Sequence, residues 1–299
     1  MKRKILYISL LFILLIAGNS GAQYGRIYVD VPLHDNIFQL HYNNIFSNTW
    51  EDQSLPVDNT ETRNNLASLF YTHVMNFFGR CGGIGLGVSA SSLLSYNPDL
   101  DTITQRVWGV GDPSLTLDMN VFGGPAVSRK NWSTFVPMSY MSAHFVMGLP
   151  LGNYDKTKST NIGSNRYTYK FVVNMSITTM KGKNWLDFYG SVKFSSTNSE
   201  FLVNHSLAQD PLFGLEAHYS QDIGNKCWVN AGLIYSGGGR TKIDGSYSGN
   251  AQSSVKGSVA VSFPTWIHGS AIVGYNNTLW KTAGSPEVHQ LIIQLNHTF

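Results

Sequence analysis

Apolar and polar side chains alternate along many segments of this chain. In Ser114–Phe122, every second residue from Leu115 to Val121 is apolar, and each residue between them is polar. The same period of two recurs in the segments 170–178, 186–194, 213–220 and 258–263. A helical period of 3.6 residues would mix the two sets of side chains on one face. The alternation therefore predicts strands with one apolar face and one polar face.

The alternating segments of the whole chain predict twelve strands. They lie near residues 36–46, 65–78, 83–95, 111–122, 135–150, 166–180, 184–196, 210–223, 227–237, 254–264, 268–280 and 288–299. Bacterial membrane barrels have even numbers of strands, and ten or fourteen strands also agree with the pattern. We expect an all-β fold, a transmembrane antiparallel up-and-down β-barrel of about 12 strands.

The connections between the predicted strands alternate in length. Long polar segments such as 47–63, 151–164 and 236–253 alternate with short turns such as 79–82 and 181–183. Outer-membrane barrels have this asymmetry, with long extracellular loops and short periplasmic turns. The connection 123–133 is longer than the rule predicts for its side. Otherwise the alternation of long and short connections places both termini in the periplasm. A soluble β-sandwich has no physical reason to alternate its connection lengths in this way.

The last predicted strand ends in an aromatic residue, which is the final residue of the sequence. One face of this strand carries Leu291, Ile293, Leu295 and Phe299. This arrangement resembles the signal that the barrel-assembly machinery reads, although His297 is polar where an apolar or aromatic residue is usual. The alternative is a soluble edge strand that ends in Phe by chance.

The composition and the N-terminal residues agree with a membrane barrel. Charged residues make up 13% of the chain, about half the ~25% usual in soluble domains, and aromatic residues also make up 13%. Lys2, Arg3 and Lys4 precede an apolar run over 5–17 and a set of small residues. This order predicts a signal peptide over 1–22, with a retained anchor helix as the alternative, and one barrel domain over 23–299. We expect the protein in the outer membrane of a Gram-negative bacterium.

The alternation also predicts which charged and ionisable side chains point into the lumen. They are His41, Asp118, His144, Lys170, Asp187, Lys193, Glu216 and His218. Twelve tilted strands give a backbone diameter of about 24 Å and, after side chains, a bore of roughly 10 Å. Such a bore could pass a small molecule. Alternatively, these side chains fill the interior, or the segment 23–36 folds inward and closes it.

The sequence holds no recognisable catalytic or metal motif. Its nine His residues are scattered and form no H-x-E, HExxH or G-x-S-x-G pattern. Glu216 and His218 suit a hydrogen-bonded pair, and no third residue suggests a metal site. We expect neither an enzyme nor a cofactor. Cys81 and Cys227 fall in predicted turns on opposite walls, too far apart for a disulfide, so both thiols should be unpaired.

One short motif resembles a known family. Gly109-Val110-Gly111-Asp112-Pro113 leads into an alternating strand, and Gly148-Leu149-Pro150 follows later. With an opening near 32–42 and Phe78-Gly79-Arg80, this order resembles the outer-membrane family named for a putative MetA-pathway of phenol degradation. The loops do not match as well. The resemblance implies passage of small, hydrophobic compounds across the outer membrane. The motif residues Gly109, Gly111, Asp112 and Pro113 could also serve a turn, since Gly and Asp favour turns and Pro can begin a strand.

Three hypotheses follow from these observations. The first is an outer-membrane channel or transporter for small, hydrophobic or aromatic compounds. The alternative is a structural or adhesive barrel with a plugged lumen that acts through its extracellular loops. The third is a lipid-modifying enzyme. The expected partners are outer-membrane lipids, the barrel-assembly machinery and a small solute; the net charge of +3 does not indicate nucleic acid.

Overall fold

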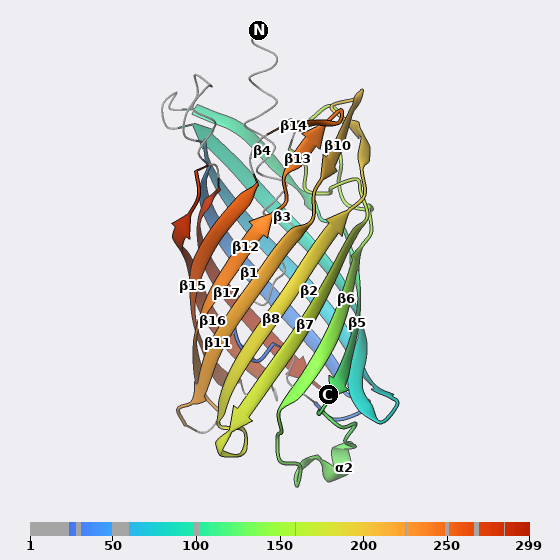
Figure 1. Ribbon diagram of the computed structural model, residues 1–299, viewed down its shortest axis with the longest axis vertical. Coiled ribbons are helices and arrows are strands. Elements are labelled where there is room, and N and C mark those ends of the chain that lie inside the picture. Colours follow the sequence, from blue (N-terminus) through green and yellow to red (C-terminus); the bar gives the residue numbers. More distant parts are fainter. Residues whose placement is uncertain are drawn as a thin grey trace.

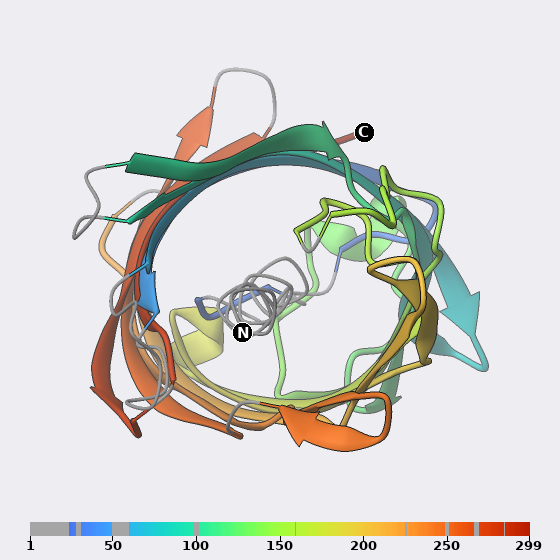
Figure 2. The ribbon, with the colours of Figure 1, turned by 90° about the horizontal axis from the view of Figure 1, so that it is seen from above.

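The strands of the protein close into a barrel. The computed structural model describes residues 24–27, 31–49, 60–97, 102–158, 160–224, 226–248, 251–265, 269–283 and 285–299. In this part of the chain, one antiparallel sheet runs in the order β2-β1-β17-β16-β15-β12-β11-β8-β7-β6-β5-β3-β4, and β2 also pairs with β3. That last pairing joins the two ends of the sheet, so the strands form a ring around a lumen (Figures 1 and 2).

The strands of the barrel wall are long enough to cross a bilayer. They are β1 (Asn36–Thr49), β2 (Thr60–Phe77), β3 (Arg80–Asn97), β4 (Thr102–Val110), β5 (Ser114–Phe122), β6 (Tyr140–Gly148), β7 (Thr168–Thr179), β8 (Asn184–Ser195), β11 (Leu212–Asp222), β12 (Trp228–Gly238), β15 (Gln252–Thr265), β16 (Gly269–Lys281) and β17 (Glu287–Thr298). A transmembrane strand needs about 9–11 residues. Nearly all lie within a few residues of the predicted segments.

The strands β4 and β5 are two halves of one crossing of the wall. Both pair with β3: Val110 lies opposite Ala90, and Ser114 lies opposite Gly87. The three residues between them, Gly111-Asp112-Pro113, interrupt the strand. The barrel therefore has twelve strands, as predicted. The predicted strand 111–122 was too short, because its extracellular half, β4, lacks a regular alternation and precedes the interruption.

Four connections contain structure that the alternation did not predict. A four-stranded sheet of β9 (Asn198–Phe201), β10 (His205–Gln209), β13 (Thr241–Ile243) and β14 (Ser246–Ser248) lies at the extracellular end (Figure 1). At the opposite end, the long connection after β5 holds the short helix α2 (Arg129–Trp132). The turn η2 (Met180–Gly182) joins β7 to β8. The unusual length of the 123–133 connection is thus used for a packed element.

The two faces of the wall have opposite character. Large apolar side chains such as Leu117, Phe171 and Leu215 are exposed on the outer face. Buried side chains inside are mostly small and polar, for example Asn174 and Asn276. Because hydrocarbon surrounds a membrane barrel, this inversion of a soluble core is what a lipid environment requires. None of the helices in the described residues is both long and apolar enough to cross a membrane.

The last strand closes the barrel against the first. β17 pairs with β1 over its whole length, and the backbone of Asn36 exchanges two hydrogen bonds with Phe299. The Phe299 ring stacks on Phe38 with centroids 5.7 Å apart. Leu291, Ile293 and Leu295 are exposed on the outer face of β17. Recognition by the assembly machinery stays a prediction. The predicted signal peptide lies outside the described residues.

This fold predicts that a charge on the outer face will destabilise the barrel. Leu117→Arg should lower the free energy of unfolding by about 2–4 kcal/mol, the cost of Arg near the bilayer midplane. The measurement is reversible unfolding in urea in the presence of lipid vesicles. Val136→Arg is the matched control, because Val136 is exposed on the connection between α2 and β6. Equal effects of the two changes would contradict the assignment of this face to lipid.

Candidate functional site: the barrel lumen

The barrel encloses a cavity of about 450 Å³. Tyr24, Ile27 and Val31 of the N-terminal segment line it, together with side chains from most of the wall. The cavity reaches from this segment to Arg166 and Lys193 near the extracellular end. A volume of 300–1,000 Å³ is typical of sites for small molecules. The lumen is therefore the candidate functional site.

The eight side chains predicted to face the lumen all lie on the inner face of the wall. His41, Asp118, His144 and Lys193 line the cavity. Lys170, Asp187, Glu216 and His218 are buried, and each is at most 9% exposed. They do not form one cluster, since they occupy several levels between the two ends of the barrel. Their part in a solute pathway stays a prediction.

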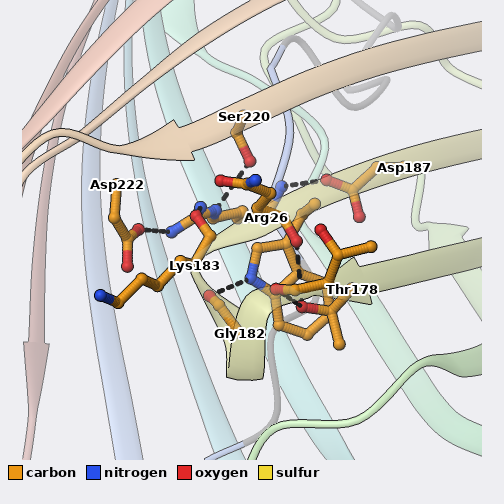
Figure 3. A network of polar contacts seen from close by, with 10 residues as sticks. Arg26, Thr178, Gly182, Lys183, Asp187, Ser220 and Asp222 are labelled. Carbon is orange, nitrogen blue, oxygen red and sulfur yellow. Dashed lines mark hydrogen bonds and ion pairs between the residues drawn. The ribbon is translucent and has the colours of Figure 1, made fainter.

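The N-terminal segment is fastened inside the lumen by Arg26 (Figure 3). Its guanidinium donates hydrogen bonds to the Asp222 carboxylate at 2.5 Å, the Ser220 hydroxyl at 2.7 Å and the Lys183 carbonyl at 2.9 Å. Its backbone N–H donates to Asp187 at 3.0 Å. Hydrogen bonds to charged groups contribute about 1.5–3 kcal/mol each, so Arg26 is a strong anchor.

The residues beside Arg26 pack against opposite parts of the wall. Tyr24 packs in a buried cluster with Ala260, Ile272 and Ile292, while Ile27 also contacts Val172 and Tyr189. Burial raises the pKa of Tyr24, so its hydroxyl stays neutral.

The fit around Gly25 is tight. A Cβ on Gly25 would lie 2.8 Å from Asp187 Oδ2 and 2.9 Å from Asn230 Nδ2, so glycine permits this close approach. The segment thus spans the lumen from β7 to β17, near the periplasmic end.

The chain then leaves the lumen through a second set of contacts. The N–H of Leu33 donates to the Val127 carbonyl, and the backbones of His34 and Asp35 bond to Val74 on β2. The buried Asp35 carboxylate accepts two hydrogen bonds from Arg129 on α2. This explains why the connection before β6 is long: its helix holds the exit of the N-terminal segment. The inward folding of 23–36, one of the alternatives from the sequence, is present in the described residues.

A chain of hydrogen bonds links Asp118, His144 and Ser142. Asp118 Oδ1 lies 2.7 Å from His144 Nδ1, and His144 Nε2 lies 2.7 Å from Ser142 Oγ. The order resembles a hydrolytic triad, but Ser142 is 1% exposed and also bonds Asn174 Oδ1 at 3.0 Å. Its strand β6 is paired on both sides, so its backbone N–H groups are used in the sheet and cannot form an oxyanion hole. We interpret the chain as a structural network between β5, β6 and β7.

Glu216 and His218 lie together, as their spacing suggested. Glu216 Oε2 is 3.1 Å from His218 Nε2, and the imidazole packs over Gly232, where any side chain would collide with it. Among the described residues, no group of three metal-ligating side chains could hold an ion. Cys81 and Cys227 are not joined by a disulfide, and the Cys81 thiol donates to the Val31 carbonyl at 3.7 Å.

The Gly-Asp-Pro motif holds the extracellular connection between β6 and β7. Asp112 accepts hydrogen bonds from the Gly152 N–H at 2.9 Å, and from the Ser164 N–H at 2.8 Å and hydroxyl at 2.5 Å.

The residues around Asp112 also contact this connection. Asn153 forms hydrogen bonds with both the N–H and the carbonyl of Val110, and a Cβ on Gly109 would collide with Asn153. The Pro113 carbonyl accepts from Leu149, and Gly111 packs against Ser89. The four motif residues therefore form a turn that clamps this loop over the wall.

Sequence reasoning missed two lumen residues, Arg26 and Arg166. Arg26 precedes the first predicted strand, where the period of two does not apply, whereas Arg166 begins the predicted segment 166–180 and has the parity of the inward-facing Lys170. Arg166 is 4% exposed although it lies in a loop. The alternation of the segment 166–180 could therefore have indicated that Arg166 faces the lumen.

Loss of the Asp112 carboxylate should release the loop it clamps. Asp112→Ala removes three hydrogen bonds, two of them to backbone N–H groups, and should cost the loop about 2 kcal/mol or more. We expect faster protease cleavage within 151–164 in intact barrels, measured by mass spectrometry. Asp244→Ala, a carboxylate in the extracellular β13–β14 turn bonded to His205 and Ser206, is the control. An unchanged cleavage rate in Asp112→Ala would contradict the clamp.

Comparison with solved structures identifies the fold. The COG4313 outer membrane channel from Pseudomonas putida F1 matches with a TM-score of 0.78 and 17% identity, over 92% of this chain and 98% of that chain. The β domain of the Bordetella autotransporter BrkA matches with a TM-score of 0.57 and 9% identity, over 88% of this chain and 99% of that chain. At such identities the matches establish a shared outer-membrane barrel fold.

Comparison of sequences identifies the family. No curated protein sequence matches the chain. The family model described as Putative MetA-pathway of phenol degradation matches residues 46–282, which is most of the chain and includes the Gly-Asp-Pro motif. The resemblance predicted from the motif is thereby confirmed. The protein is a β-barrel of the outer membrane and belongs to the Putative MetA-pathway of phenol degradation family.

Proposed function

We propose that this protein is a passive channel for small, hydrophobic or aromatic compounds across the outer membrane. The observation that carries the proposal is the cavity of about 450 Å³ inside a closed barrel. A barrel that served only to display loops could fill this space with side chains. The cavity is large enough for a small solute and has both apolar and polar walls. The structurally similar channel from Pseudomonas putida F1 supports the same function.

The N-terminal segment acts as the gate in this proposal. Tyr24, Ile27 and Val31 line the cavity, and Arg26 between them bonds Asp222 and the Lys183 carbonyl near the periplasmic end. The segment is held by the Arg26 hydrogen bonds and by Asp35, and it is covalently joined to the wall only through β1. Breaking a few hydrogen bonds would therefore let it move without disturbing the sheet. These contacts set the free-energy difference between the closed arrangement and an open one.

Solute entry tests the proposal directly. Purified protein in liposomes should speed the entry of small uncharged aromatic solutes over protein-free liposomes. In cells, a deletion strain should take up such compounds more slowly than the complemented strain. Identical uptake by the two strains across a broad panel of solutes would contradict the channel.

The gate can be tested by weakening its anchor. Arg26→Gln removes the ion pair with Asp222 and should raise the probability of opening about tenfold or more, since loss of a charged hydrogen bond costs at least 1.5 kcal/mol. The measurement is single-channel recording in planar bilayers. Lys156→Gln is the control, because its pair with Glu200 is exposed at the extracellular end and lies outside the gate. An unchanged opening probability in Arg26→Gln would contradict the role of the N-terminal segment as the gate.

The same recordings test the main alternative, an adhesive barrel with a permanent plug. Such a barrel would show no conductance steps even after residues 24–35 are removed. The channel proposal expects steps in that variant, because the segment that crosses the lumen near the periplasmic end is then absent. The small extracellular sheet formed by β9, β10, β13 and β14 is the surface on which an adhesive role would depend.

A further inference from the structure

Lys and Arg gather in the connections at the periplasmic end of the barrel (Figure 1). The described residues of these connections are 78–79, 123–139, 180–183, 223–224 and 226–227. Their basic residues are Arg129, Lys130, Lys181, Lys183 and Lys226. None of the residues in these ranges is Asp or Glu. The turns at this end of the barrel therefore carry an excess of positive charge.

The lysines of these turns have no anionic partner in the described part of the chain. Those that are exposed and take part in no ion pair between described residues are Lys130, Lys181, Lys183 and Lys226. Asp222, at the end of β11, is already bound to Arg26 at 2.5 Å. At the other end of the barrel, by contrast, the exposed Lys156 pairs with Glu200. The periplasmic lysines are thus available to an anion from outside the chain.

Three of these turns also expose a large apolar side chain close to a cation. Phe78 is 99% exposed and lies two positions before Arg80. Met180 is 71% exposed and directly precedes Lys181. Ile223 is 59% exposed in the turn before β12, which also holds a lysine. An apolar side chain beside a cation suits the boundary between acyl chains and headgroups, because each of the two finds its own environment there.

The backbone holds several of these side chains in a conformation that favours glycine. The φ angle is 52° at Phe78 and at Met180, 57° at Lys181 and 64° at Lys226. This left-handed region is costly for residues with a Cβ, and Asn or Gly is usual at the first position of a two-residue hairpin turn such as Phe78-Gly79. The fold by itself would therefore be better served by other residues. A contact outside the chain gives a reason for the strain.

The position of these turns favours lipid as the binding partner. They follow one another along the sheet, from the β2–β3 turn to the β11–β12 turn, at the edge where the lipid-facing wall ends (Figures 1 and 2). A protein partner would bind one contiguous face, whereas a bilayer leaflet meets every turn around the ring. Each Lys or Arg close to an anionic membrane surface adds to the attraction between protein and lipid.

We propose that these periplasmic turns bind the phosphate groups of anionic phospholipids in the periplasmic leaflet of the outer membrane. The exposed lysines supply the charge, and Phe78, Met180 and Ile223 enter the boundary with the acyl chains. The inference names a partner for the turns and does not depend on the channel function.

A comparison of two lipids tests the proposal. The full mature protein is folded into phosphatidylcholine vesicles that contain a trace of spin-labelled phosphatidylglycerol or spin-labelled phosphatidylcholine. Electron spin resonance then measures the fraction of each label held at the protein. The association constant of phosphatidylglycerol should exceed that of phosphatidylcholine about fivefold, the effect of one surface cation on an anionic lipid. Salt at about 1 M should remove the difference, because charges more than roughly 3 Å apart are then screened.

Two sets of variants locate the binding. The combined variant Lys130→Gln, Lys181→Gln, Lys183→Gln and Lys226→Gln should bring the two association constants to about the same value, because its turns keep few cations. The control combines Lys156→Gln with Lys158→Gln, which are exposed cations at the extracellular end, and should leave the preference unchanged. Heat-modifiable migration on gels verifies that each variant is folded. If the combined variant does not fold, each single Lys→Gln change should remove part of the preference.

Two results would overturn the proposal. The first is equal association of the two lipids with the wild type, which would favour an acidic periplasmic protein as the partner of these cations. The second is a preference for phosphatidylglycerol that the lysine changes leave intact or that the control variant loses equally. Conductance recorded on the same preparations keeps the two proposals apart: conductance steps without a lipid preference would uphold the channel alone, and a preference without steps would uphold the lipid-binding turns alone.

Discussion

The structure depends on closure of the backbone hydrogen-bond ladder. In hydrocarbon an unpaired N–H or carbonyl has no water to bind, so a spanning sheet must have no free edge. Here β1 meets β17 along twelve paired positions, and β2 meets β3 at the other side of the first hairpin. The interruption at Gly111-Asp112-Pro113 breaks this rule locally, and the loop clamped by Asp112 covers it by pairing Asn153 with Val110. The family motif thus serves the closure of the wall.

Closure of the sheet also leaves an interior space that the protein has to fill. A ring of twelve strands is too wide for its side chains to fill completely, so the protein must plug, hydrate or use the space. The N-terminal segment fills the periplasmic part, and its anchors are polar because the wall it meets is polar. Arg26 reaches Ser220 and Asp222 on one strand, whereas Tyr24 uses a small apolar patch around Ile292. A plug held this way can be stable and still release, since no backbone ladder ties Tyr24–Ile27 to the wall.

The remaining cavity is asymmetric, and its asymmetry follows the order of strands. The first hairpins supply uncharged side chains, and Lys193 on β8 supplies a cation from the other side of the ring. The lining of the cavity therefore differs in polarity from one side to the other.

The alternation along the chain was enough to predict the barrel wall. A period of two is visible without any contact, because each residue faces either lipid or lumen, and it predicted twelve strands and the inward direction of residues such as Asp187 and Lys193. The contacts that hold the N-terminal segment across the lumen could not be read from that alternation. The bonds from Arg26 to Asp222 and from Arg129 to Asp35 join residues about a hundred positions or more apart, and neither Arg lies on an alternating strand. The pairing of Lys170 with Lys193 depends on the register between β7 and β8. A local alternation does not specify which residues of distant strands contact each other, because those contacts form only when the sheet closes into a barrel.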